Sequence, residues 1–156
     1  MSDVLTFLET LAPVEALRFS RWAYAAVNTL HVLAIALVVG GAVPLALRLY
    51  GLWRDVPRSG IVRVLSVTAG GGLALAVITG SLLFATRAGE YAANPALPVK
   101  MVLVLVGAVS AVQAHRRFGS DLNTVTPAVA RRLGLVSLIC WIGALAAGRL
   151  IALVRG

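Results

Sequence analysis

The sequence predicts an all-α integral membrane protein, a four-helix bundle with a short amphipathic helix at its N-terminus. Of its 156 residues, 60% are hydrophobic and only 13% are charged, whereas soluble domains carry about 25% charged residues. Four apolar segments, over residues 22–47, 64–85, 99–114 and 133–153, are close to the ~20 residues that a helix needs to cross the hydrocarbon core. The connections leave no room for a soluble domain, so we expect a single four-span domain over residues 1–156.

The N-terminal residues are expected to form a short helix that lies along the membrane surface. The apolar side chains on one face of that helix are Val4, Phe7, Leu8 and Leu11, a pattern typical of interfacial helices. Ser2 is a suitable N-cap, and Pro13 marks the predicted end of the helix. The segment has no basic first region and no small-residue cleavage site, so we predict that it is retained rather than removed as a signal peptide.

Basic residues are distributed unequally among the connections. Those after the first and third spans are Arg48, Arg54, Arg58, Arg63, Arg116, Arg117, Arg131 and Arg132, whereas the connection after the second span has only Arg87 and Lys100. Because Lys and Arg in short loops remain cytoplasmic, both termini are predicted to face outward, into the periplasm for a bacterial inner-membrane protein. This distribution accounts for the net charge of +8, so we expect membrane lipids rather than nucleic acid as partners.

A histidine lies inside the first apolar span. His31 is predicted to lie ~13 Å inward from Trp22, within the hydrocarbon, where ionisable residues are costly and are functional candidates. Arg21, Tyr24 and Asn28 precede it at helical spacing and share its face. Two interpretations remain open. His31 is either a ligand or proton-handling residue, or a neutral side chain that only hydrogen-bonds Asn28 or a neighbouring helix.

Counting inward along the other spans predicts which residues lie at the depth of His31. The count gives Thr79, Gly107 and Cys140. A histidine with space beside a glycine and with a soft ligand nearby suits haem iron or copper. The lone cysteine is also typical of a small buried hydrophobe, and it excludes an intramolecular disulfide.

The second histidine, His115, is predicted near the cytoplasmic end of the third span, beside Arg116 and Arg117. Two histidines that ligate one haem need similar depths, and the expected offset of ~12 Å from His31 argues against that pairing. Helix tilt or a kink at Pro44 would reduce the offset. The alternative is an interfacial residue near the lipid phosphates.

A ring of polar residues is expected at the outer surface: Arg21, Tyr24, Arg87, Glu90, Tyr91, Lys100 and Arg149. It is suited to pairing with haem propionates, or with lipid head groups. The sequence has no dinucleotide-binding, Walker or zinc-protease motif, which argues against nucleotide-driven chemistry. The apolar spans carry no carboxylate, which argues against a carboxylate-relay proton pump.

The stretch from Trp22 to Trp53, with the stretch from Thr79 to Arg117, resembles an uncharacterised family of small four-span bacterial inner-membrane proteins. The shared pattern is a first-span histidine, the Arg48 to Gly51 exit, the motif YAANPA and Lys100 before the third span. More distantly, the layout is similar to the copper-resistance D membrane domain and to HemJ-type protoporphyrinogen oxidases. The latter resemblance implies that His31 is associated with haem. Their second histidine would map near Ala111 rather than to His115.

These observations lead to one principal prediction and two alternatives. The principal prediction is a membrane b-type haem protein with a redox role, in which His31 is an axial ligand and His115 or Cys140 is the second ligand. The other predicted contacts of the cofactor are Arg21, Asn28, Lys100 and Arg149. A redox partner protein or a quinone, and a homo-oligomer, are the expected partners. The alternatives are a copper-handling protein that uses His31, His115, Cys140 and Met101, and a structural subunit without a cofactor.

Overall fold

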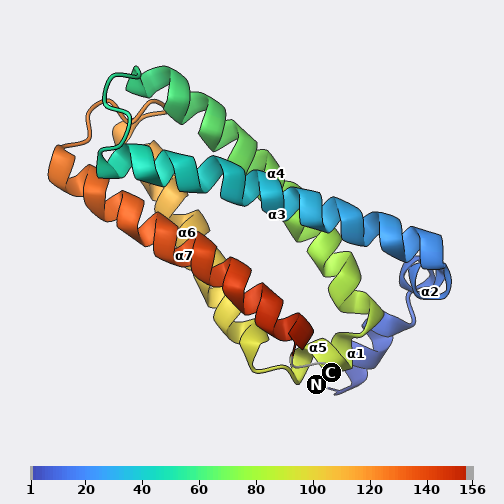
Figure 1. The fold of residues 1–156 in the computed structure, drawn as a ribbon. Helices are drawn as coiled ribbons and strands as arrows, with labels where there is room; N and C mark the ends of the chain where they lie inside the picture. The colour runs from blue at the N-terminus through green and yellow to red at the C-terminus, as the bar shows by residue number, and fades with distance from the viewer. Residues whose placement is uncertain (1, 154–156) are drawn as a thin grey trace.

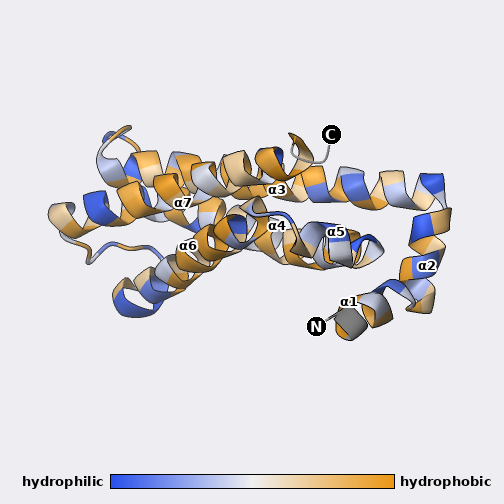
Figure 2. Cartoon of the chain, turned by 90° about the horizontal axis from the view of Figure 1, so that it is seen from below, coloured by the Kyte–Doolittle hydropathy of each residue, from blue (hydrophilic) through white to orange (hydrophobic). Residues whose placement is uncertain are grey.

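The computed structural model describes residues 2–153 and contains four long helices, which form a bundle. These are α3 (Arg21–Tyr50), α4 (Arg58–Thr86), α6 (Ala96–Phe118) and α7 (Pro127–Leu153). All four are long and apolar enough to cross a membrane, and Figure 2 shows them hydrophobic along most of their length. The predicted fold class is therefore confirmed, and each predicted span lies within one of these helices.

One end of the bundle is named here the basic end, because it holds the two arginine-rich connections (Figure 1). A buried cluster at this end joins residues of all four long helices and of the connection after α6; it includes Leu49, Val62, Ala114, Leu122 and Ala130. Both ends of the described chain lie at the opposite end, named the terminal end (Figure 1). There α3 extends beyond α7.

Two glycines bring the backbones of α3 and α4 close together in the middle part of these helices. A Cβ atom built on Gly72 would lie 2.8 Å from the backbone nitrogen of Val38, and one built on Gly41 would lie 2.7 Å from the carbonyl oxygen of Leu65. Any larger side chain would therefore push the two backbones apart. Such close approach supplies packing in lipid, where no hydrophobic force drives helices together. These contacts set the register that places the α3 site residues opposite α4.

The N-terminal segment departs from its predicted boundary. The expected single helix ending near Pro13 is instead two short helices, α1 (Ser2–Glu9) and α2 (Ala12–Phe19). Pro13 lies in the first turn of α2, where proline is tolerated because the amide of that position has no partner within the helix. The capping role predicted for Ser2 rests on a side chain outside the described residues.

Short elements close the terminal end. The five-residue helix α5 (Ala88–Ala92) follows α4, and Glu9 of α1 accepts a hydrogen bond of 3.1 Å from the amide of Gly89. Asn94 is buried and donates to the carbonyl of Ile151 in α7 at 3.4 Å. These bonds attach both α1 and the α5 segment to the ends of the long helices.

Candidate functional site around His31

The His31 imidazole is held by a threonine on the neighbouring helix. Its Nδ1 lies 2.8 Å from Thr79 Oγ1, and the same hydroxyl donates to the Leu75 carbonyl at 2.7 Å. A threonine hydroxyl has one proton, and that proton is used on Leu75. Thr79 therefore accepts from His31, so Nδ1 carries the ring proton and Nε2 carries the lone pair.

A glycine provides the space in which the ring lies. A Cβ atom built on Gly80, next to Thr79, would lie 3.0 Å from His31 Cε1. The carbonyl of Ala76, one turn earlier on α4, also faces the imidazole. The ring is thus positioned by a hydroxyl, a carbonyl and a gap on one face of α4.

Lys100 on α6 is an electrostatic neighbour of His31. It lies in the second turn of α6, within electrostatic reach of the His31 ring, and its ammonium group packs against α7, where a Cβ on Gly148 would be 3.5 Å from Nζ. The site therefore draws on all four long helices. From its predicted position at the outer surface, Lys100 was expected to contact a cofactor. Its proximity to the imidazole was not predicted.

Among the described residues, Asn28 is not the hydrogen-bond partner of His31. It shares a helix face with His31, but within residues 2–153 the hydrogen bond of His31 goes to Thr79 rather than to Asn28. The reason is geometric, since Thr79 faces the ring from a separate helix at contact distance. The prediction that Thr79 lies at the depth of His31 is confirmed.

Cys140 and Gly107 lie deeper than predicted. They contact each other, with a Cβ on Gly107 only 3.1 Å from Cys140 Cβ, and the adjacent Trp141 packs against Val38 and Ala42. Val38 is seven residues beyond His31 on α3, or ~10 Å toward the basic end. The expected layer of His31 with Gly107 and Cys140 is therefore wrong. Gly148, seven residues after Trp141, comes to the depth of His31 instead.

His115 belongs to the basic end of the bundle. Its Nε2 lies 3.0 Å from Ser66 Oγ on α4, and Ser66 is thirteen residues, or ~20 Å, from Thr79 along the same helix. His31 and His115 cannot reach one haem iron across that distance. The structure thus rejects the pairing of these two histidines and enlarges the offset that the sequence predicted.

Two further predicted contact residues have exposed side chains. Met101 is 56% exposed on α6, and Arg149 is exposed on α7. Among residues 2–153 no group of three histidine, cysteine or acidic side chains is placed to hold a metal ion. The set proposed for copper is dispersed over the bundle.

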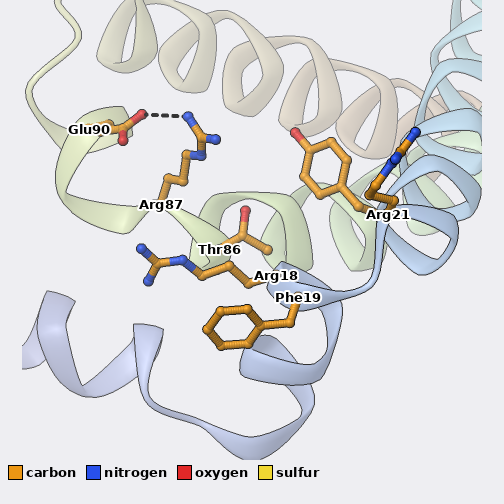
Figure 3. A pocket seen from close by; sticks show the side chains of 7 residues that line it. Arg18, Phe19, Arg21, Thr86, Arg87 and Glu90 are labelled. Carbon is orange, nitrogen blue, oxygen red and sulfur yellow. Dashed lines mark hydrogen bonds and ion pairs between the residues drawn. The ribbon is translucent and has the colours of Figure 1, made fainter.

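Arg21 and Tyr24 line a separate pocket at the terminal end (Figure 3). Its volume is about 650 Å³, and its lining residues are Arg18, Phe19, Arg21, Tyr24, Thr86, Arg87 and Glu90. Arg21 is ten residues, or ~15 Å, from His31 along α3. Arg18 is absent from the ring of polar residues that the sequence predicted at the outer surface. Its place beside Arg87 depends on how α2 folds back against α4.

Comparisons with models of known protein families, with curated proteins and with solved structures found no match to this chain.

Proposed function

We propose that this chain is a membrane-embedded b-type haem protein with a redox role, in which His31 is the axial ligand. The observation that supports this most directly is the hydrogen bond from His31 Nδ1 to Thr79. Histidines that ligate metals typically donate their other ring nitrogen to a fixed acceptor, which sets the tautomer and the orientation of the ring. Bound haem would supply the one-electron chemistry.

The chain's own residues have distinct tasks in this proposal. Thr79 keeps the proton on Nδ1 and so leaves Nε2 as the donor atom. Gly80 leaves space beside the ring. Lys100 lies within electrostatic reach of His31 and is suited to a carboxylate of the porphyrin. A second histidine or cysteine ligand is not part of the proposal, because Cys140 and His115 lie at other depths.

Copper is a weaker candidate on the same grounds. A copper site needs two or more histidine, cysteine or methionine ligands close together, whereas His115 and Cys140 lie at other depths than His31. Among the described residues no group of three histidine, cysteine or acidic side chains is placed to hold a metal ion. Haem needs only one protein ligand in addition to the macrocycle. This difference favours haem.

The proposed location is a bacterial inner membrane, with the basic end in the cytoplasm and the terminal end in the periplasm. The support is the arginine content of the two connections at the basic end. A quinone or a redox protein would then exchange electrons with the bound group. Fusion of an alkaline phosphatase or a fluorescent reporter to the C-terminus tests the orientation, since phosphatase activity requires the periplasm.

The decisive experiment is a visible spectrum of the detergent-purified protein, oxidised and then reduced with dithionite, with a pyridine haemochrome assay of stoichiometry. We expect a Soret band and about one haem per chain, and loss of both in His31→Ala. The structural-subunit alternative predicts a colourless protein even when haem is supplied in excess. A coloured protein whose spectrum is unchanged in His31→Ala would reject His31 as the ligand.

A further inference from the structure

The pocket at the terminal end is lined by three arginines from three different segments (Figure 3). Arg18 comes from α2, Arg21 from the first turn of α3, and Arg87 from the junction of α4 with α5. Glu90 is the acidic residue of the lining. Two arginines at the junction of α2 with α3, and a third at the distant junction of α4 with α5, thus place an excess of positive charge around one cavity.

The internal ion pairs leave most of this positive charge available. Arg18 pairs with Glu9 at 3.7 Å and Arg87 with Glu90 at 3.4 Å, and each of the two arginines is more than half exposed. Exposed pairs of this kind are weak. A guanidinium also has five N–H donors, of which one such contact uses one or two. Arg21 has no acidic partner among residues 4–153, whose side chains the structure describes.

Aromatic side chains beside the pocket indicate where it lies relative to lipid. Phe19 lines the pocket and is 78% exposed, and Trp22, next to Arg21, is 87% exposed. Exposed tryptophan at the end of an apolar helix is typical of the interface between acyl chains and head groups. The arginines therefore lie at the level of lipid phosphates.

We propose that this pocket binds the phosphodiester head group of an anionic phospholipid, with Arg21 and Arg87 as its main contacts. Guanidinium groups bind phosphate oxygens bidentately, and the hydroxyl of Tyr24 lies in the same lining as a further donor. The volume of about 650 Å³ exceeds the need of a single phosphate and accommodates its glycerol part. This inference does not depend on the proposed haem.

Trp22 provides a reporter for the experiment. In a Trp53→Phe, Trp141→Phe parent protein the remaining tryptophan is Trp22. The parent is reconstituted in nanodiscs of phosphatidylcholine in which one fifth of the lipid has dibrominated acyl chains. This brominated lipid is phosphatidylglycerol in one sample and phosphatidylcholine in the other. Quenching of Trp22 by each brominated lipid then gives the relative association constant of the two head groups.

We expect phosphatidylglycerol to be favoured about thirtyfold, since each of the two arginines near the membrane surface contributes about 1 kcal/mol to binding of anionic lipid. In the double variant Arg21→Gln, Arg87→Gln the two lipids should associate about equally. The preference should persist in Arg131→Gln, Arg132→Gln, a matched loss of two charges at the basic end. The doubly lysine-substituted protein, Arg21→Lys with Arg87→Lys, should retain part of the preference and separates loss of the site from misfolding.

Three results would overturn the proposal. The parent would show no preference for phosphatidylglycerol, or the preference would survive Arg21→Gln, Arg87→Gln, or the control at the basic end would lose it equally. Inorganic phosphate, added against chloride at equal ionic strength, distinguishes the source of the anion. If inorganic phosphate binds to a parent protein that shows no preference for phosphatidylglycerol, the pocket binds free phosphate rather than a lipid head group.

Discussion

Nδ1 of His31 lies 2.8 Å from Oγ1 of Thr79 on the adjacent helix, and this bond determines which ring nitrogen is left with a lone pair. Since the Thr79 hydroxyl donates its proton to the Leu75 carbonyl, it accepts the hydrogen bond from His31. The bond also fixes the register of α3 and α4 at this depth. Tyr24 and Thr86, each seven residues nearer the terminal end, line the same pocket.

Replacing Thr79 by valine should weaken the proposed haem binding about 10- to 100-fold, because loss of an orienting partner has that effect on metal sites. Valine preserves the shape of the side chain and removes the acceptor. Haem titration of the apoprotein, followed by the Soret band, measures the change. Thr79→Ser is the matched control and should bind nearly as well as the unmodified protein. Equal affinity of the valine variant would show that the bond does not orient a ligand.

Gly80→Ala should disturb the imidazole, because its Cβ atom would lie 3.0 Å from His31 Cε1. The ring must then shift by a few tenths of an ångström, and we expect a shifted Soret maximum or weaker haem retention. Gly71→Ala introduces the same methyl group where nothing lies within 4 Å, so its spectrum should be unaltered. Identical spectra for both variants would contradict the close contact of Gly80 with the ring.

Gly72→Ala should destabilise the bundle by about 1–3 kcal/mol, the usual cost of overpacking. Its Cβ atom would lie 2.8 Å from the Val38 nitrogen and 2.9 Å from the Ala34 carbonyl, and backbone atoms cannot move aside independently. Thermal unfolding in detergent measures the difference. Gly70→Ala, with nothing within 4 Å, should be neutral or slightly stabilising, because alanine favours the helix over glycine.

Arg48→Ala should destabilise the basic end by about 1–3 kcal/mol, because it removes two hydrogen bonds that a buried, charged side chain donates. Arg48 is only 7% exposed, and its guanidinium donates to the carbonyls of Val56 at 2.9 Å and Arg54 at 3.4 Å. Arg54→Ala is the comparison, since the single bond of that side chain to Gly51 is exposed. Protease cleavage within the connection from 51 to 57 should increase in Arg48→Ala. Equal cleavage in both variants would show that Arg48 does not hold this connection.

His115→Ala and Cys140→Ala should each leave the haem content and spectrum unchanged. The reason is depth, since His115 is bonded to Ser66 at the basic end and Cys140 lies in the layer of Val38. Stoichiometry from the pyridine haemochrome assay tests both variants against His31→Ala. Loss of haem in either would restore that residue as a ligand.

The sequence by itself determined the number of spans, their approximate limits and the isolation of His31 among apolar residues. Apolar runs of sufficient length have few alternatives to crossing a membrane, because lipid requires every backbone polar group to be bonded within the helix. It also showed that Thr79 lies at the depth of His31. That estimate needed only the helical rise and two neighbouring spans joined by a short connection.

The tertiary structure decided which residues meet. Each long helix is apolar on nearly every side, so its sequence carries no stripe that tells which face packs inward. Rotation and register depend instead on the close approaches at Gly41 and Gly72, which bring Thr79 rather than Asn28 to His31. The predicted depth of Cys140 was wrong because α3 extends beyond α7 at the terminal end (Figure 1). Residues counted inward from the start of α3 and from the end of α7 therefore start at different depths. Arg87 comes beside Arg18 and Arg21 only because α2 and α5 fold around the ends of the long helices.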